Sequence, residues 1–352
     1  MRSLLLAFLA SFLAGLAAPQ AAKKTRTKQE VEDAIDKAGK TPPEWFAKTK
    51  LNYPNTLDLT WPKNPQGPWD QSKNIGQFIW STINENPARW QEGICFLHYL
   101  LTLYKDKEEQ LNRTMAALGR MYHDLHEDWA RAAFWWRKAG ETDTDDLADC
   151  YWKLGNKEMA VEILDKIGSD RTRNCTVIKL WSDMGEFDKA IKLAEERGAD
   201  DSAAMLAAGD ACRLVGKFDD AIKYYDKVLA VASNDRDNPR NKNRAKASKE
   251  AIQLFDTLDV KKVAPGKYTA DSLGYEKLVT VEVVVAAGKI TSCKVTQHQE
   301  KQFYSSVTDT PARIIAKQNV KGVEATSGAT ITSEAIINAS AKALAQGLPK
   351  KK

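Results

Sequence analysis

The sequence predicts a multidomain protein in which an all-α helical-repeat domain precedes a small α+β domain with an antiparallel sheet. Two observations carry this prediction. All ten tryptophans lie between Trp45 and Trp181, and from Leu278 onward the chain changes to alternating valine and threonine, LVTVEVVVAAGKITSCKV. A change in composition and hydrophobic period indicates a boundary between domains of different class. The length of 352 residues accommodates two or more domains.

The composition is that of an ordinary folded chain, with 43% hydrophobic residues, 28% charged residues and a formal net charge of +5. No basic stripe interleaved with aromatic residues occurs, so we expect no nucleic-acid partner. The five cysteines show no CxxC or CxxCH spacing, which argues against a zinc knuckle and a c-type haem. In an oxidising compartment one disulfide could form, but the spacing does not say which.

Residues 1–22, MRSLLLAFLASFLAGLAAPQAA, contain one arginine, an apolar stretch and then small residues. This order is typical of an export signal. The apolar stretch is shorter than the roughly twenty residues that a membrane-spanning helix needs. We therefore expect an exported protein, periplasmic or extracellular, that is either free or membrane-associated through an uncleaved signal.

Residues 110–260 contain an internal repeat. The segments CYWKLGNKEMAVEILDKI, KLWSDMGEFDKAIKLAEE and ACRLVGKFDDAIKYYDKV each carry a glycine, a bulky residue and then an alanine within a helical apolar pattern. These alanines, together with that of a degenerate upstream copy, are Ala132, Ala160, Ala190 and Ala221. The units resemble tetratricopeptide repeats, helix-turn-helix pairs with a standard period of about 34 residues. The resemblance covers roughly residues 110–231 and implies a stack with a concave face for partners.

Two flanking regions complete the helical domain. Residues 23–109 are rich in proline and tryptophan and then helical, and we expect them to form an N-terminal cap on the stack. A charged loop, SNDRDNPRNKNRAK, is expected to precede a connecting helix over about residues 248–258. The tryptophans expected in the core between neighbouring repeats are Trp129, Trp135, Trp136, Trp152 and Trp181.

Residues 262–348 make up the predicted α+β domain. A strand is expected over residues 265–275, followed by a hairpin that pairs residues 279–286 with residues 290–296. One helix is expected to follow Pro311, and a last helix follows the stretch EATSGATITSE. Strands followed by helices favour helices packed on one face of an antiparallel sheet.

Outside this domain, the best candidate for chemistry is a pair of histidines. His123 and His126 stand three residues apart on an expected helix, close to acidic residues, so a metal site is conceivable. No motif places a third ligand, and a polar helix face is the favoured interpretation. GxSxG, HExxH, P-loop and GxGxxG motifs do not occur. We therefore assign neither a metal site nor a catalytic residue from the sequence.

The stretch EATSGATITSE is unusually rich in hydroxyl groups for a helix start, because one capping oxygen is enough. A helix N-terminus attracts phosphate through its free N–H groups and its dipole. Gly328 permits close approach of the backbone, and side-chain hydroxyls can donate to phosphate oxygens. The hydroxyls available are those of Thr326, Ser327, Thr330, Thr332 and Ser333. The stretch is therefore either a capped loop or a phosphate site.

The order of motifs in the second domain decides between these alternatives. GKYTA, LGY, a VEVVVAAGKI hairpin, QHQE, PARIIAKQN and VEATSGATITSEAIINASAKAL follow one another over residues 262–348. This arrangement is similar to the FMN-binding domain of the peripheral flavin subunits of Na⁺-pumping NADH:quinone reductase and of the Rnf complex. The resemblance implies that Thr330 receives FMN through a phosphoester made by a separate flavin transferase. The family usually has Asp where this chain has Glu324.

The resemblance also implies roles for the neighbours of Thr330. Ser327, Gly328 and Ala329 would shape the phosphate pocket, while Thr332 and Ser333 would cap the following helix. Two tyrosines of the expected sheet are candidates to lie against the flavin ring, and ordinary sheet aromatics are the alternative interpretation. They are Tyr268 and Tyr275.

The function that we expect is an exported electron-transfer flavoprotein, a carrier more than a stand-alone enzyme, whose repeats dock a redox protein or a membrane electron-transfer complex. Two alternatives are open. The first is a secreted repeat scaffold whose FMN-type domain has lost its flavin, which the Glu324 substitution favours. The second is a flavin-dependent reductase of a small substrate. It ranks lowest because the second domain has no further nucleotide motif and no Arg/His cluster.

Overall fold

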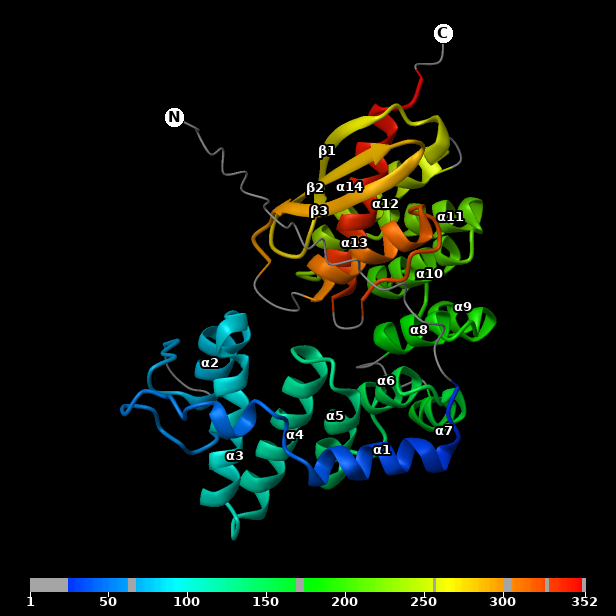
Figure 1. Cartoon of the computed structure of the whole chain (residues 1–352). Helices are drawn as coiled ribbons and strands as arrows, with labels where there is room; N and C mark the ends of the chain where they lie inside the picture. The colour runs from blue at the N-terminus through cyan, green and yellow to red at the C-terminus, as the bar shows by residue number, and fades with distance from the viewer. Residues whose placement is uncertain are drawn as a thin grey trace, which may run out of the picture.

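The computed structural model describes residues 25–62, 68–168, 174–255, 258–300, 305–326 and 329–349. The expected export signal lies outside these residues and stays a prediction. A helical domain is followed by a small sheet domain, which packs against the last helices of the helical domain (Figure 1). This arrangement confirms the predicted fold class. Within the described ranges we find no helix with the length and apolar character needed to cross a membrane.

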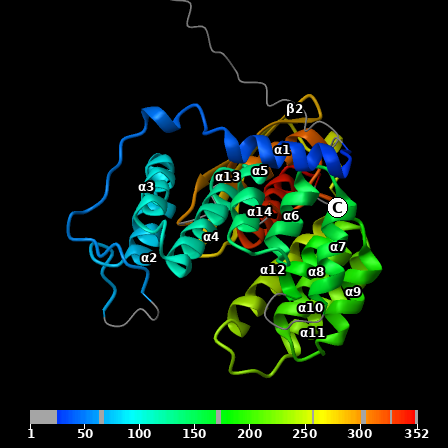
Figure 2. The same ribbon diagram turned by 90° about the horizontal axis from the view of Figure 1, so that it is seen from below.

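Helix pairs joined by tight turns build the helical domain, and they follow one another along a curved row (Figure 2). The pairs are α4 (Glu108–Asp124) with α5 (Trp129–Lys138), α6 (Asp145–Lys153) with α7 (Lys157–Ile167), α8 (Asn174–Asp183) with α9 (Phe187–Glu196), and α10 (Ser202–Leu214) with α11 (Phe218–Ala230). These are the four units that the alanine repeat predicts. The first helices of the pairs are α4, α6, α8 and α10, and we call them the inner helices.

Glycine makes the turn inside three of these pairs. Gly155, Gly185 and Gly216 have φ values of 99°, 78° and 80°, which lie in the left-handed region that side chains with a Cβ disfavour. Each of these residues ends its first helix, so the chain reverses within a few residues. The glycine of the repeat pattern is therefore a backbone requirement of the turn.

The repeated alanines lie where the two helices of each pair touch. Ala132, Ala160, Ala190 and Ala221 are all fully buried. A methyl side chain at these positions lets the second helix approach the first closely. The repeat tryptophans pack around these contacts as predicted: three are buried, and Trp129 and Trp152 are partly buried against the same core.

The N-terminal residues add helices at one end of the row of helix pairs, and their first helix packs against the side of that row. Helix α3 (Trp90–Leu103) packs on α4, after α2 (Ile75–Phe78) and a π-helical turn, η2 (Ile79–Asn84). Two short 3-10 turns, η1 (Phe46–Lys48) and η3 (Pro87–Arg89), flank them. Helix α1 (Lys28–Lys40) returns to lie along α5 (Figures 1 and 2), where Arg137 Nη1 lies 2.6 Å from Glu32 Oε2.

The C-terminal domain is a three-stranded antiparallel sheet in the order β1 (Gly266–Leu273), β2 (Leu278–Ala286), β3 (Lys289–Gln297). The alternate valines Val279, Val281, Val283 and Val285 are fully or almost fully buried. Helix α14 (Thr330–Gln346) packs on β1 and β2, and α13 (Ser305–Lys317) packs on β3. Both the strands and the helix-on-sheet layering agree with the sequence prediction.

Two helix starts differ from the prediction. The connecting helix α12 (Asn238–Phe255) begins about ten residues earlier than expected, inside the segment taken for a charged loop. Pro239 is its second residue, a place where proline favours helix formation. Helix α13 begins at Ser305, before Pro311 and not after it, and Pro311 is buried inside the helix.

Helix α12 joins the two domains. It packs on α10 and α11 on one side and on α14 on the other, and the 3-10 turn η4 (Val260–Lys262) leads from it into β1. Buried apolar residues of both domains form one continuous cluster. The domain limits at residues 110, 260, 262 and 348 stay predictions, because the packing is continuous across them.

All five cysteines are free thiols, so the structure contains none of the disulfides that the composition would allow.

Candidate functional site

The predicted attachment residue, Thr330, is the first residue of α14 and is half-buried. Ala329 stands directly before it and is 5% exposed. Ser327 and Gly328, which are expected to shape the phosphate pocket, lie outside the described residues. Thr330 therefore lies at a helix N-terminus, where the helix dipole favours an anionic group.

A buried glutamate that the site prediction did not include organises this helix start. Glu300 is 4% exposed, and its carboxylate accepts the backbone N–H of Tyr275 at 3.2 Å and of Glu276 at 3.1 Å. The hydroxyl of Thr332 donates to the same carboxylate. Three hydrogen bonds compensate the burial of this charge. They hold the β1–β2 connection against the first turn of α14.

Thr332 and Ser333 do not cap α14, and this part of the prediction was wrong. Thr332 is engaged by Glu300, while the Oγ of Ser333 accepts the backbone N–H of Thr326 at 3.0 Å. The N-cap position is Ala329, which makes no side-chain capping bond. Both hydroxyl residues point back to the preceding segments because they lie inside the first turn, beyond the N-cap position.

The helix start fits a phosphate group on two observations. The first N–H groups of α14 receive no side-chain cap at Ala329. The hydroxyl of Thr326, which is 2% exposed, has no hydrogen-bond partner among the described residues. Backbone N–H groups that Ala329 does not cap, and a hydroxyl without a partner in the described part of the chain, are donors that a phosphate oxygen can use.

Glu324 lies at the border of the two domains. Its backbone carbonyl accepts Arg313 Nη1 at 3.0 Å. Across the border, burial raises the pKa of the Asp183 carboxyl, the neighbouring Lys179 ammonium opposes this rise, and the charge of Glu324 adds to it. The last turn of α8 therefore lies close to the segment that leads into Thr330.

The two tyrosines predicted as ring contacts have different positions. Tyr268 packs against Gly347 and donates its hydroxyl to the carbonyl of Ala264 at 2.7 Å. It lies at the far end of α14, about 25 Å from Thr330 at 1.5 Å per residue, so we withdraw it as a ring contact. Tyr275 is 47% exposed beside Glu300, and the guanidinium of Arg240 lies 4.7 Å from its ring centre.

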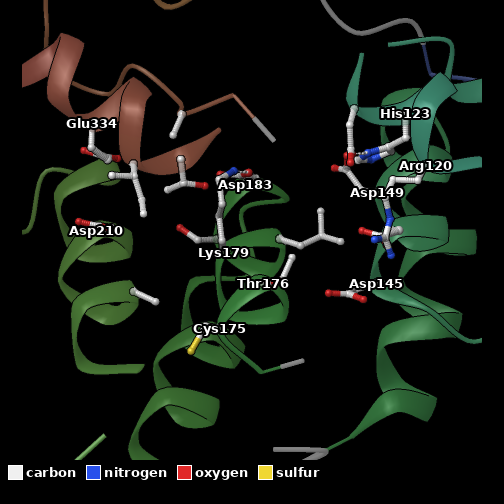
Figure 3. Close-up of a pocket in the computed structure, with 18 of the residues that line it drawn as sticks. Arg120, His123, Asp145, Asp149, Cys175, Thr176, Lys179, Asp183, Asp210 and Glu334 are labelled. Atoms are coloured by element: carbon white, nitrogen blue, oxygen red, sulfur yellow. Dashed lines mark hydrogen bonds and ion pairs between the residues drawn. The ribbon is translucent and has the colours of Figure 1, made fainter. Parts of the chain in front are cut away.

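A cavity of about 850 Å³ lies between the two domains. One wall is the face of α14 that carries Thr330, Ile331, Glu334 and Ile337, and the opposite walls come from the inner helices (Figure 3). Trp80 of the π-helical turn also lines the cavity and is 46% exposed. The concave face of the repeats is therefore turned toward the start of α14.

Ion pairs hold the charged side chains of this cavity. Arg213 of α10 forms a buried ion pair with Glu334 of α14 and donates to Asn338 Oδ1 at 3.1 Å. Lys179 pairs with Asp183 within α8. Because Arg213 and Glu334 belong to different domains, their ion pair joins two walls of the cavity.

His123 and His126 do not form a metal site. His123 lies between Asp124 Oδ1 at 2.6 Å and Asp149 Oδ2 at 3.1 Å, whereas His126 stacks on Trp45 at 5.5 Å between ring centres. Their side chains have separate surroundings, and the described ranges contain no group of three metal-ligating residues. Burial lowers the pKa of His123, but the two carboxylates outweigh this effect and raise its pKa to about 10.

Comparison with known families agrees with this geometry. Residues 274–345 match the FMN-binding domain. Residues 146–167 and 204–239 match the tetratricopeptide repeat. Comparisons with curated proteins and with solved structures gave no match. The chain thus carries a C-terminal FMN-binding domain preceded by tetratricopeptide repeats, which are elements of protein–protein interaction.

The sequence did not indicate the cavity residues of the repeats. Ser182, Asp146 and Trp80 line it from three different elements, and no motif links them. Burial, together with the nearby Asp145 and Asp124 carboxylates, raises the pKa of Asp146 to about 6, against the opposing charge of His123. The sequence signal for Ser182 and Asp146 is their place on the inner helices α8 and α6, which a repeat alignment provides but a motif search does not, and Trp80 lies outside the repeats.

Proposed function

We propose that this protein is an exported electron-transfer flavoprotein that carries FMN on Thr330 through a phosphoester bond. The observation that carries the proposal is the position of Thr330 at the uncapped start of α14, at the edge of the interdomain cavity. FMN exchanges one or two electrons when bound. The residues of this chain hold and orient it: the α14 N–H groups and the Thr326 hydroxyl meet the phosphate, and Glu300 fixes the first turn of α14.

A covalent bond suits an exported protein. A ligand held only by equilibrium binding dissociates when its free concentration falls below the dissociation constant. Outside the cytoplasm the supply of FMN is limited, and a phosphoester to Thr330 removes this dependence. The maturation partner required is a flavin transferase acting before or after the domain folds.

The first test is flavin fluorescence in a gel after SDS denaturation. The protein is co-expressed with a flavin transferase in a bacterial periplasm, beside Thr330→Ala and the matched variant Thr291→Ala, which removes an exposed threonine from β3. We expect a fluorescent band for the wild type and for Thr291→Ala, and a dark band for Thr330→Ala. A dark wild-type band would exclude the covalent flavin under these conditions.

The electron donor or acceptor is proposed to be a redox protein or a membrane electron-transfer complex that docks on the repeats. Since the inner helices face the C-terminal domain across the cavity, the surfaces left for such a partner are the second helices of the pairs and the cavity opening. Export is tested by recovering the mature protein from the periplasm and sequencing its N-terminus, which we expect close to residue 22.

A second candidate function is a repeat scaffold whose C-terminal domain carries no flavin. Glu324 favours this scaffold, because its side chain is longer than the Asp usual in the family and changes the segment that a flavin transferase recognises. The variant Glu324→Asp distinguishes the flavin-free scaffold from the flavoprotein. If Glu324 prevents attachment, the wild-type band is dark and the Glu324→Asp band is fluorescent. Equal fluorescence in both would remove the support for the scaffold.

A further inference from the structure

The interdomain cavity has an unused polar group on its wall. Ser182 lines the cavity, is 6% exposed, and its Oγ has no hydrogen-bond partner among the described residues. A buried hydroxyl without a partner destabilises the folded chain relative to a satisfied one. The Ser182 hydroxyl is therefore available to donate a hydrogen bond to an acceptor inside the cavity.

Ser182 belongs to a different wall of the cavity from Thr330. It stands next to Asp183 in the last turn of α8, and Asp183 interacts with the charge of Glu324, six residues before Thr330. Ser182 and Thr330 line the same cavity from opposite domains. A group attached to Thr330 and extending into the cavity therefore faces side chains of both domains.

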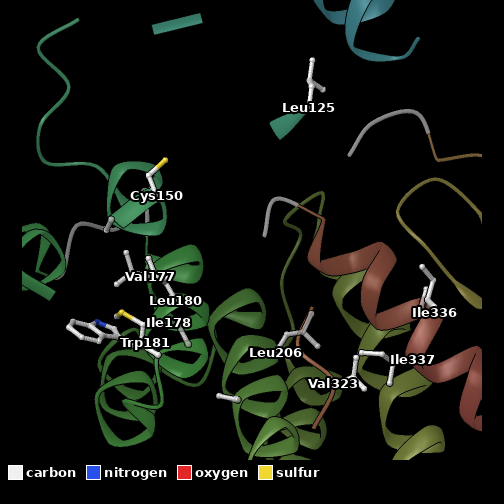
Figure 4. Packing of buried hydrophobic residues seen from close by; sticks show 14 of the residues in the cluster. Leu125, Cys150, Val177, Ile178, Leu180, Trp181, Leu206, Val323, Ile336 and Ile337 are labelled. Atoms are coloured by element: carbon white, nitrogen blue, oxygen red, sulfur yellow. The ribbon is translucent and has the colours of Figure 1, made fainter. Parts of the chain in front are cut away.

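Besides the ion-paired side chains, the cavity wall carries apolar residues. Leu180, Leu206, Val323 and Ile337 all line it and come from both domains (Figure 4). The isoalloxazine ring of FMN has one apolar dimethyl edge and one polar edge with carbonyl oxygens, so it needs this combination of apolar surface and few donors. The volume of about 850 Å³ lies within the roughly 300–1,000 Å³ typical of small-molecule sites.

We propose that the interdomain cavity binds the isoalloxazine ring of the FMN carried by Thr330, and that the Ser182 hydroxyl donates a hydrogen bond to the polar edge of the ring. This inference rests on the proposed function and deepens it. The repeats then form half of the cofactor site, and the ring is shielded by both domains while partners reach it through the opening of the cavity.

The test fills the cavity and measures the exposure of the ring. Ala207 lines the cavity from α10, and Ala207→Trp takes up the space that the ring needs. Ala230 is exposed at the end of α11, and Ala230→Trp is the matched control. Flavin-loaded proteins are titrated with iodide, which quenches the fluorescence of solvent-exposed flavin. We expect a quenching constant several-fold higher for Ala207→Trp than for the wild type and for Ala230→Trp.

The outcomes separate this inference from the proposed function. A bright band after SDS with equal iodide quenching in all three folded proteins overturns the ring site and leaves the covalent flavin intact. A dark wild-type band overturns the covalent flavin itself. The band after SDS is expected to be bright for Ala207→Trp also, because the phosphoester at Thr330 does not depend on where the ring lies.

A second variant covers the case in which Ala207→Trp does not fold. Ser182→Ala is compared with Ser233→Ala, which removes an exposed serine hydroxyl. In the flavin-free Thr330→Ala background, we expect Ser182→Ala to leave the melting temperature unchanged or raised, since it removes an unsatisfied group. In protein that carries FMN, we expect Ser182→Ala, and not Ser233→Ala, to shift the flavin absorption band and the reduction potential. An unchanged spectrum and potential would overturn the hydrogen bond to the ring.

Discussion

His123 is an imidazole buried between two carboxylates, and this setting keeps it charged. Burial alone lowers its pKa, but Asp124 and Asp149 raise the pKa to about 10. His98 shows the opposite case: it is buried among aromatic rings without a carboxylate partner, and burial lowers its pKa to about 4. The difference between the two histidines comes from their hydrogen-bond partners, because both are largely shielded from water.

The raised pKa of His123 predicts a pH dependence of stability. A group whose pKa is higher in the folded chain than in the unfolded chain contributes stability that is fully present below the unfolded value of about 6.5. That contribution is lost as the pH rises through about 10. We expect the free energy of unfolding to fall by on the order of 5 kcal/mol between these values.

The measurement compares wild type with His123→Gln by urea unfolding from pH 6 to pH 10. The glutamine amide keeps one hydrogen bond but carries no charge, so its curve should be flatter, and the gap between the two proteins should narrow toward high pH. Other groups that titrate in this range contribute equally to both proteins. Parallel curves would show that His123 is not the group responsible.

The sequence offered only part of this residue-scale detail. It placed His123 on a helix, as the structure has it, and favoured a polar helix face, which is wrong because His123 is 5% exposed. The sequence could not show that His123 is buried, because the burial comes from packing between repeats. Its partner Asp149 belongs to the next repeat, 26 residues further on. Thr330 could be proposed as the attachment residue because it belongs to a local motif. Ser182 could not be proposed from the sequence, because the role we infer for it depends on the other domain.

At the scale of the element, the turn glycines are the clearest link between sequence and fold. Gly185 has a φ of 78°, and a Cβ built on it would meet nothing within 4 Å. Any cost of a substitution at Gly185 is therefore backbone strain and not a steric clash. We expect Gly185→Ala to lower the free energy of unfolding by about 1 kcal/mol.

Gly185→Asn is the matched variant, because asparagine adopts the left-handed region more readily than alanine. Thermal or urea unfolding of both should rank the proteins as wild type, then Gly185→Asn, then Gly185→Ala. If the two variants were equally stable, the backbone conformation at Gly185 would not be the cause of the loss.

The elements that sequence reasoning placed well are those with local signals. The four helix pairs follow from the glycine and alanine repeat, and the β2–β3 hairpin follows from the alternating valines. The starts of α12 and α13 were placed too late because Pro239 and Pro311 were read as the end of a loop. Proline is also compatible with the first turn of a helix, and the choice depends on packing that the local sequence does not contain.

At the scale of the molecule, the cavity arises only when the two domains meet. Its walls come from the inner helices and α14, and the lining residues Arg113 and Ile337 are more than two hundred positions apart in the sequence. No periodicity or motif in either domain predicts this contact. The buried Arg213–Glu334 ion pair is the polar link across it, with Asn338 and Ser248 extending the hydrogen bonds.

This ion pair predicts how the two domains unfold. Removing one partner leaves a buried charge uncompensated, which typically costs about 3–5 kcal/mol, whereas replacing both by apolar residues of similar size is often neutral. We expect Arg213→Met to uncouple the C-terminal domain from the repeats, and the double variant Arg213→Met/Glu334→Met to restore most of the coupling.

Two probes follow the domains separately. All ten tryptophans lie between Trp45 and Trp181, so tryptophan fluorescence reports the helical domain alone. Hydrogen exchange of the α14 amides reports the C-terminal domain and does not depend on a bound cofactor. In the wild type the two urea transitions should coincide, and in Arg213→Met α14 should lose its protection at lower urea than the tryptophans report. Coincident transitions in the single variant would mean that the apolar cluster shared by the domains, and not the ion pair, holds α14 against the repeats. In that case the position of Thr330 at the cavity would depend on α12 packing alone.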